Sequence, residues 1–149
     1  MEKKIIINDS EQMILLGKKI GELAFANMVI TMEGDLGAGK TTMTKGIALG
    51  LGIKEIVNSP TFTIMKTYKG KFDLYHLDVY RINDPYSDFE LEEYFENNGI
   101  CVIEWASQIK PILPDEFLEI IITDLGNNKR QVMLRSDSMK YNNVISEVQ

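Results

Sequence analysis

The chain has 149 residues, of which 44% are hydrophobic and 26% charged, and its formal net charge is −6. These values predict one globular domain spanning residues 1–149, and they exclude disordered and collagen-like chains. No apolar run reaches the roughly 18 residues of a membrane span, which excludes a transmembrane protein. The basic and then apolar start, Met1–Ile7, is too short for a signal peptide. The single cysteine, Cys101, favours a reducing, cytoplasmic setting.

Strands and helices alternate in the first part of the chain. In order, we expect a strand over Lys3–Ile7, a helix from Asp9 to about Ala26, a strand over Met28–Met32 and a helix from Thr41 to about Leu49. The first helix is predicted because Asp9 and Gln12 form a capping-box pattern, after which apolar residues recur at helical spacing. Gly50 and Gly52 are expected to end the second helix.

Hairpins dominate the later part. In order, we expect strands over Phe62–Tyr68 and Phe72–Leu77 joined at Lys69–Lys71, an acidic helix over Ser87–Glu96, a strand over Ile100–Ile103, and strands over Leu118–Ile122 and Gln131–Leu134 joined at Gly126–Asn128. The polar residues Ser136–Gln149 fit either a short helix or a frayed tail. The pattern predicts an α/β domain with a mixed, partly parallel β-sheet flanked by helices, its parallel part lying around the glycine turn.

Acidic charge is concentrated between Ile82 and Glu119, where ten Asp and Glu residues accompany one basic residue, Lys110. This segment has two interpretations, a solvated helix face and a docking surface for a basic protein, and both stay open. The overall pI near 4.8 argues against holding nucleic acid by neutralising its phosphates. We therefore expect no strong direct binding to RNA.

The glycine-rich turn matches the phosphate-binding pattern G-x-x-x-x-G-K-[ST] in full, with Gly34, Asp35, Leu36, Gly37, Ala38, Gly39, Lys40 and Thr41. Such glycines let backbone N–H groups turn towards phosphate oxygens, and the following helix adds the positive end of its dipole. Lys40 can reach the β- and γ-phosphates, the Thr41 hydroxyl can bind Mg²⁺, and Thr42 can cap the helix or touch the α-phosphate. The pattern predicts a P-loop NTPase; an ordinary turn between strand and helix is the alternative. No base-reading motif for guanine is present, which favours ATP.

Two carboxylates follow apolar strand segments, where α/β sheets place catalytic groups. Asp78 can hold Mg²⁺ directly or through water, and Glu104 can orient or deprotonate an attacking water. For each residue, an ordinary role at a strand end is the alternative. The only histidine, His76, is predicted to be packed or hydrogen-bonded rather than a metal ligand, because nothing pairs with it at metal-site spacing.

Over roughly residues 10–114, these segments resemble the TsaE (YjeE) family, small bacterial ATPases needed for threonylcarbamoyladenosine formation on tRNA. The phosphate loop alone is shared by many families, but the later pieces are much more selective. The matching pieces are Gly34–Thr42, Ser59-Pro60-Thr61-Phe62-Thr63, His76-Leu77-Asp78-Val79-Tyr80-Arg81, Leu91-Glu92-Glu93-Tyr94 and Val102-Ile103-Glu104-Trp105.

The resemblance implies a set of ligands and roles. It implies ATP or ADP and Mg²⁺ as ligands, and TsaD and TsaB as protein partners, with the chain alone a monomer or weak oligomer. The catalytic residues that it implies are Lys40, Thr61 and Glu104, and the Mg²⁺ ligands are Thr41, Asp78 and Glu104. It places Trp105 beside the nucleotide, whereas the residue pattern by itself favours core packing. Tyr80 and Arg81 would shape the site or the partner surface.

Two other classes of protein carry the same phosphate loop and are alternatives for this chain. A small-molecule or nucleoside kinase usually grips the transferred phosphate with an arginine-rich lid, and the three arginines of this chain, Arg81, Arg130 and Arg135, do not cluster. The other alternative is a binding module in which ATP holds a conformation and turnover is incidental. Glu104→Ala separates that module from an ATPase, because the module would keep its pathway activity without hydrolysis.

Overall fold

The computed structural model of the chain describes residues 1–35, 37–60, 65–82 and 91–148. Its strands are β1 (Glu2–Ile7), β2 (Val29–Glu33), β3 (Met65–Tyr68), β4 (Leu74–Asp78), β5 (Ile100–Glu104), β6 (Leu118–Gly126) and β7 (Lys129–Arg135). Its helices are α1 (Ser10–Glu22), α2 (Lys40–Gly50) and α3 (Met139–Glu147), with two 3₁₀ helices, η1 (Leu91–Glu96) and η2 (Ala106–Ile112). No helix within these ranges is long and apolar enough to cross a membrane.

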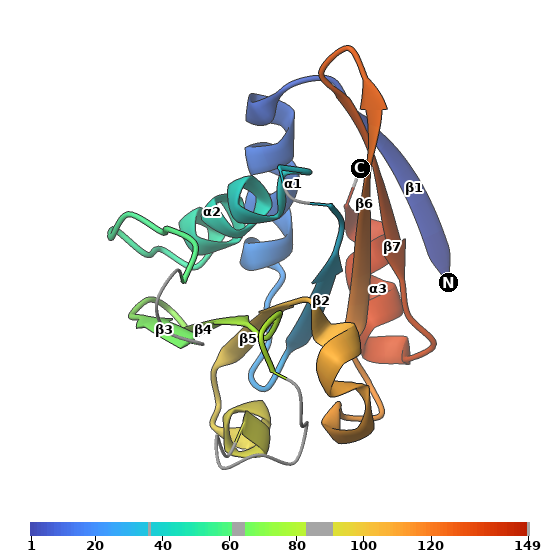
Figure 1. The fold of residues 1–149 in the computed structure, drawn as a ribbon. Coiled ribbons are helices and arrows are strands. Elements are labelled where there is room, and N and C mark those ends of the chain that lie inside the picture. The colour runs from blue at the N-terminus through green and yellow to red at the C-terminus, as the bar shows by residue number, and fades with distance from the viewer. Residues whose placement is uncertain (36, 61–64, 83–90, 149) are drawn as a thin grey trace.

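The strands form one mixed sheet in the order β1-β7-β6-β2-β5-β4-β3 (Figure 1). β2 lies between β6 and β5 and is parallel to both, and β5 is also parallel to β4. Antiparallel pairs complete the sheet at each end, β6–β7–β1 on one side and β4–β3 on the other. The predicted fold class is confirmed, with its parallel part around the strand that precedes the glycine turn.

The start of α1 follows the capping prediction with one difference. The Asp9 carboxylate accepts a hydrogen bond from the Gln12 backbone N–H at 2.9 Å, but the Gln12 side chain accepts from the N–H of Asn8, not of Asp9. The helix ends at Glu22, four residues before the predicted end. The chain leaves the helix at the C-cap Leu23, and Asn27, with a left-handed φ of 68°, then lies just before β2.

The contact between α1 and α2 is built on glycine (Figure 1). At each of four positions, an added Cβ atom would overlap a backbone carbonyl oxygen of the opposite helix. These positions are Gly17 and Gly21 in α1, and Gly46 and Gly50 in α2. The two backbones therefore touch directly, and this contact fixes the helix that follows the phosphate loop.

Both predicted hairpins form, with shifted limits. β4 begins at Leu74 rather than Phe72, and β3 begins at Met65, because the first part of the predicted strand lies outside the described residues. The β6–β7 turn contains Asn127 and Asn128, both with positive φ, as expected for a tight hairpin turn.

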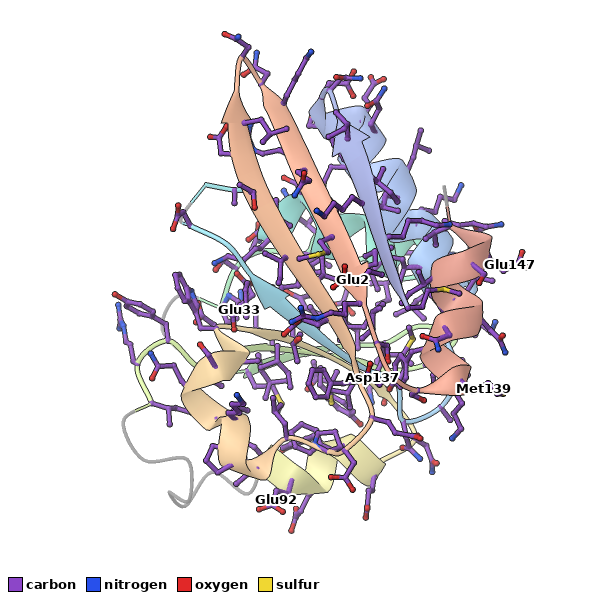
Figure 2. The ribbon with its side chains drawn as sticks, turned by 90° about the vertical axis from the view of Figure 1, so that its right-hand side faces the viewer. Glu2, Glu33, Glu92, Asp137, Met139 and Glu147 are labelled. Carbon is purple, nitrogen blue, oxygen red and sulfur yellow. The ribbon has the colours of Figure 1, made fainter. Side chains whose placement is uncertain are left out.

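The acidic segment, the segment after β5 and the C-terminal segment each had a different outcome. The described part of the acidic helix, η1, is 3₁₀ rather than α, and residues 87–90 lie outside the description. Figure 2 shows Glu92 on its outer side. The pattern did not predict η2, which contains Pro111. Of the two expectations for the C-terminal segment, the helix is observed: α3 lies beside β1, and Lys3 Nζ donates to the Val148 carbonyl at 2.6 Å (Figure 2).

Candidate functional site

The phosphate loop joins the end of β2 to the start of α2. Gly37 and Gly39 have φ of 79° and 114°, values that residues with a Cβ rarely adopt. A Cβ at Gly34 would lie 2.8 Å from the Ile122 carbonyl oxygen of β6, so this glycine permits close packing against the sheet. No acidic residue occupies the first turn of α2, and its free N–H groups and positive dipole end suit an anion.

Lys40 lies folded against the loop. Its side-chain nitrogen donates to the Gly34 carbonyl at 2.6 Å and lies 3.9 Å from the centre of the Trp105 ring. The residue is only 5% exposed, so its ammonium group is held between a carbonyl and an aromatic face. Thr41 and Thr42 follow in the first turn of α2, and both are half-buried.

Asp78 and Glu104 come together with the loop at one edge of the sheet. They end β4 and β5 and are Cα partners, and Glu104 is also paired with Met32 of β2, just before the loop. The Trp105 N–H donates to the Met32 carbonyl at 3.2 Å, which ties this edge together. At the same edge, Glu33 of β2 (labelled in Figure 2) accepts a hydrogen bond from the Ser107 N–H at 2.9 Å.

The two carboxylates have different surroundings. Asp78 is half-buried, and its Oδ1 accepts from the Tyr80 N–H at 3.1 Å. Glu104 is only 4% exposed, and its Oε2 lies 2.6 Å from Nε2 of His76. His76 is fully buried and hydrogen-bonded, as predicted.

Trp105 lies beside Lys40 rather than inside a core. It is half-buried, and its backbone is left-handed, with φ of 62° and ψ of 37°. The ring of Tyr80, 58% exposed, packs on it with centroids 4.9 Å apart. The expectation of core packing holds in part, because the residue packs against the edge of the core that includes Ile109 while its ring also covers the lysine of the loop.

The structure describes only some of the remaining predicted site residues. Leu36 and Thr61 lie outside the described residues. Asp35 is exposed and Ala38 buried, and the Ala38 N–H donates to the Asp35 carbonyl at 3.0 Å. Across the described ranges, no three His, Cys, Asp or Glu side chains gather in a way that could hold a metal ion by themselves.

The sequence patterns missed one wall of the site. A hollow of about 380 Å³ adjoins the loop between the β1–α1 junction and the β6–β7 hairpin, lined in part by Asn8, Asp9, Ser10, Gly39, Thr42 and Arg130. Arg130 Nε donates to the Ala38 carbonyl of the loop at 3.0 Å. Neither segment is close to the loop in sequence or carries a nucleotide-binding motif, so only the sheet order reveals the contact.

Comparison with known proteins identifies relatives along most of the chain. A family model described as threonylcarbamoyl adenosine biosynthesis protein TsaE matches residues 7–132. The tRNA threonylcarbamoyladenosine biosynthesis protein TsaE of Bacillus subtilis is 46% identical over 139 residues, which cover 93% of this chain and 88% of that protein. Its namesake in Treponema pallidum is 39% identical over 118 residues, 78% of this chain and 87% of the relative.

The fold has a counterpart among solved structures. A crystal structure of Bacillus subtilis YdiB superposes with a TM-score of 0.88 at 40% identity, and the match covers 99% of this chain and 93% of that one. The family match includes every segment on which the motif resemblance was based.

Proposed function

The chain belongs to the TsaE family, as the motif resemblance predicted, and from that premise we propose that it is an ATP-hydrolysing accessory subunit acting on a TsaD–TsaB pair. The pathway is the one for which the relatives are named, threonylcarbamoyladenosine formation on tRNA. One observation carries the proposal: a complete phosphate loop enters α2 beside two strand-end carboxylates at the same edge of the sheet.

The loop would hold the phosphates of ATP. Backbone N–H groups of residues 34–39 and of the first turn of α2 would bind their oxygens, and Thr42 would touch the α-phosphate. Lys40 would leave the Gly34 carbonyl for the β- and γ-phosphates, an exchange of one acceptor for a stronger, charged one.

The residues fit a magnesium ion held together with phosphates. Such ions take few protein ligands, which agrees with the absence of an acidic cage among the described residues. Thr41 and Asp78 would hold Mg²⁺, with Glu104 as a further ligand, and bound there the ion would neutralise charge on the transferred phosphoryl group. Glu104 would also orient or deprotonate the attacking water, and Thr61 would act near the γ-phosphate as the resemblance implies.

The hollow beside the loop would receive the base and ribose. It is continuous with Gly39 and Thr42, and its 380 Å³ is within the usual size of small-molecule sites. Trp105 would lie beside the phosphates on the opposite side, where it already covers Lys40. Hydrolysis would be slow in the chain alone and coupled to TsaD–TsaB, which would carry out the chemistry on tRNA; the net charge of −6 agrees with leaving tRNA to those partners.

The experiment is product formation by purified TsaD–TsaB, supplied with preformed threonylcarbamoyl-adenylate, excess tRNA and ATP, with and without this chain. We expect the chain to convert limited turnover into sustained, ATP-dependent turnover, and Lys40→Met to abolish that effect. If product formation is the same with and without the chain, the proposal is wrong, and a screen for phosphate acceptors would test the kinase alternative.

A further inference from the structure

A buried pair of ionisable side chains lies at the carboxyl end of the parallel strands. His76 of β4 is 0% exposed and Glu104 of β5 is 4% exposed, and their Nε2 and Oε2 atoms lie 2.6 Å apart. Both side chains are on the sheet face that packs against α1 and α2, with Leu74 and Val102 of the same core cluster as neighbours on these strands. The contact is therefore a short, buried hydrogen bond at the border of the core.

The bond has a defined direction. A carboxylate can only accept, so His76 donates through Nε2–H. The other ring nitrogen, Nδ1, is buried and has no hydrogen-bond partner among the described residues. A proton on Nδ1 would be a buried donor without an acceptor in the described part of the chain, so Nε2–H is the donor that the site accommodates. This single donor fixes one oxygen of Glu104.

A contribution to folding stability is a poor explanation for the pair of His76 and Glu104. Replacing two buried hydrogen-bonding partners with apolar groups of the same shape can be nearly neutral or stabilising, and apolar Leu74 and Val102 already lie beside the pair on the same strands. Its position is functional, because Glu104 is the strand partner of Asp78 and precedes Trp105, which covers Lys40 of the loop. Oε2 is committed to His76, whereas Oε1 makes no hydrogen bond to any described residue.

We propose that His76 is the positioning residue for Glu104: it holds Oε2 so that Oε1 is the one oxygen presented to the nucleotide site. The inference rests on the proposed ATPase function and adds a residue that acts only through Glu104. Outer partners that orient a working carboxylate or histidine in this way typically change activity 10–100-fold when removed.

Three variants test the role in the complex with TsaD–TsaB. The amide nitrogen of His76→Gln can occupy the place of Nε2, whereas that of His76→Asn matches Nδ1 and cannot reach Glu104. We expect kcat for ATP hydrolysis to fall about 10–100-fold in His76→Asn and His76→Leu and only a few-fold in His76→Gln. ADP affinity and KM should change less than about threefold in all three, because the phosphate loop is untouched.

A second measurement separates positioning from folding. In a Glu104→Ala background, adding His76→Leu should lower the residual kcat no further, because the residue through which His76 acts is gone. Equal kcat in the Gln and Asn variants, or an undiminished effect of His76→Leu in the Glu104→Ala background, would overturn the positioning role while leaving the ATPase proposal intact. An unmodified chain that hydrolyses no ATP with TsaD–TsaB would instead overturn the proposed function itself, and the inference with it.

Discussion

The two faces of the sheet are covered in different ways (Figure 1). On the face with the phosphate loop, α1 and α2 touch through four glycines, and their buried side chains form one cluster with those of α3. On the other face, the short 3₁₀ helices η1 and η2 cover the sheet with side chains such as Phe95 and Ile109, in a separate cluster. The loop is thus fixed by close contact between helix backbones, whereas the segment that Trp105 begins packs on the sheet mainly through side chains, with the Trp105 N–H bonded to the Met32 carbonyl.

This difference teaches where the molecule tolerates change. Backbone contact leaves no room for added atoms, so the helix that carries Lys40 keeps its position relative to β2. The short 3₁₀ helices η1 and η2 have poorer hydrogen-bond geometry than α-helices, and we expect them to open more easily than α1 and α2. The proposed nucleotide site, built between both faces, would combine a fixed phosphate loop with a more adaptable wall.

The largest effect is expected from breaking the glycine contact. Gly46→Ala places a methyl group against the Ile14 carbonyl oxygen, and we expect the free energy of unfolding to fall by about 1–3 kcal/mol or more. Helix propensity alone predicts the opposite sign, a gain of about 1 kcal/mol for replacing glycine in a helix. Urea titration gives the sign, and Leu49→Ala, at a residue 54% exposed on the same helix, is the control expected to stay within about 0.5 kcal/mol. A stabilised Gly46→Ala would contradict the packing.

A smaller effect is expected at the wall that the motifs missed. Arg130→Gln removes a charged donor from the Ala38 carbonyl, and we expect ADP to bind about tenfold more weakly in calorimetry. Asp124→Asn is the matched control, since Asp124 contacts Arg130 at 3.3 Å with a side chain that is 56% exposed, and such pairs contribute little. Equal losses in both variants would show that the contact with the loop is not what matters.

The contact between Lys40 and Trp105 predicts an optical signal. The chain has one tryptophan, so its emission reports this site alone. Phosphates that draw Lys40 away from the ring would break an interaction of about 0.5–2 kcal/mol, and we expect added ADP to change the emission of Trp105. Lys40→Met should already show altered emission without ADP and should respond little to it. ADP that binds by calorimetry without any emission change would rule out the movement.

The smallest effect concerns the η1–η2 face. Burial raises the pKa of the Cys101 thiol to about 12, and its Sγ donates to the Tyr94 carbonyl of η1 at 3.2 Å, so we expect slow reaction with a thiol reagent at pH 8. If this face opens locally, saturating ADP should slow the reaction less than about twofold. If ADP instead slows the reaction of Cys101 as strongly as it slows global unfolding, both faces open together, and the difference between the two faces does not hold.

Local patterns were sufficient for much of the fold. The capping pair before α1, the apolar run of β2 and the asparagine turn of the second hairpin depend on neighbours in sequence, and all three appear near the predicted positions. η2 was missed because its course depends on tertiary contacts, the left-handed Trp105 and the bond from the Ser107 N–H to Glu33. The end of α1 was misplaced because the apolar residues Leu23–Phe25 continue the pattern beyond the helix.

The candidate site likewise has a part that local sequence patterns predict and a part that they do not. Residues 34–42 carry a contiguous pattern, and Asp78 and Glu104 stand where their strands end, so sequence alone could place them at one edge. The bond between His76 and Glu104 and the contact of Arg130 with Ala38 join segments far apart in the chain. Only the register of the sheet determines such pairs, and no local pattern carries it.

The position of β1 affects how the protein is made. β1 leaves the ribosome long before β7, yet among the described strands β7 is its one partner, so its pairing is complete only after Arg135 has been added. At about 5–20 residues per second, that wait is on the order of ten seconds. The hollow beside the phosphate loop gains its last wall, Asn128 and Arg130, at the same stage of synthesis. If the proposed nucleotide binding uses this hollow, a growing chain has no finished pocket until the final hairpin is made, and nucleotide binding would distinguish a folded product from a nascent one.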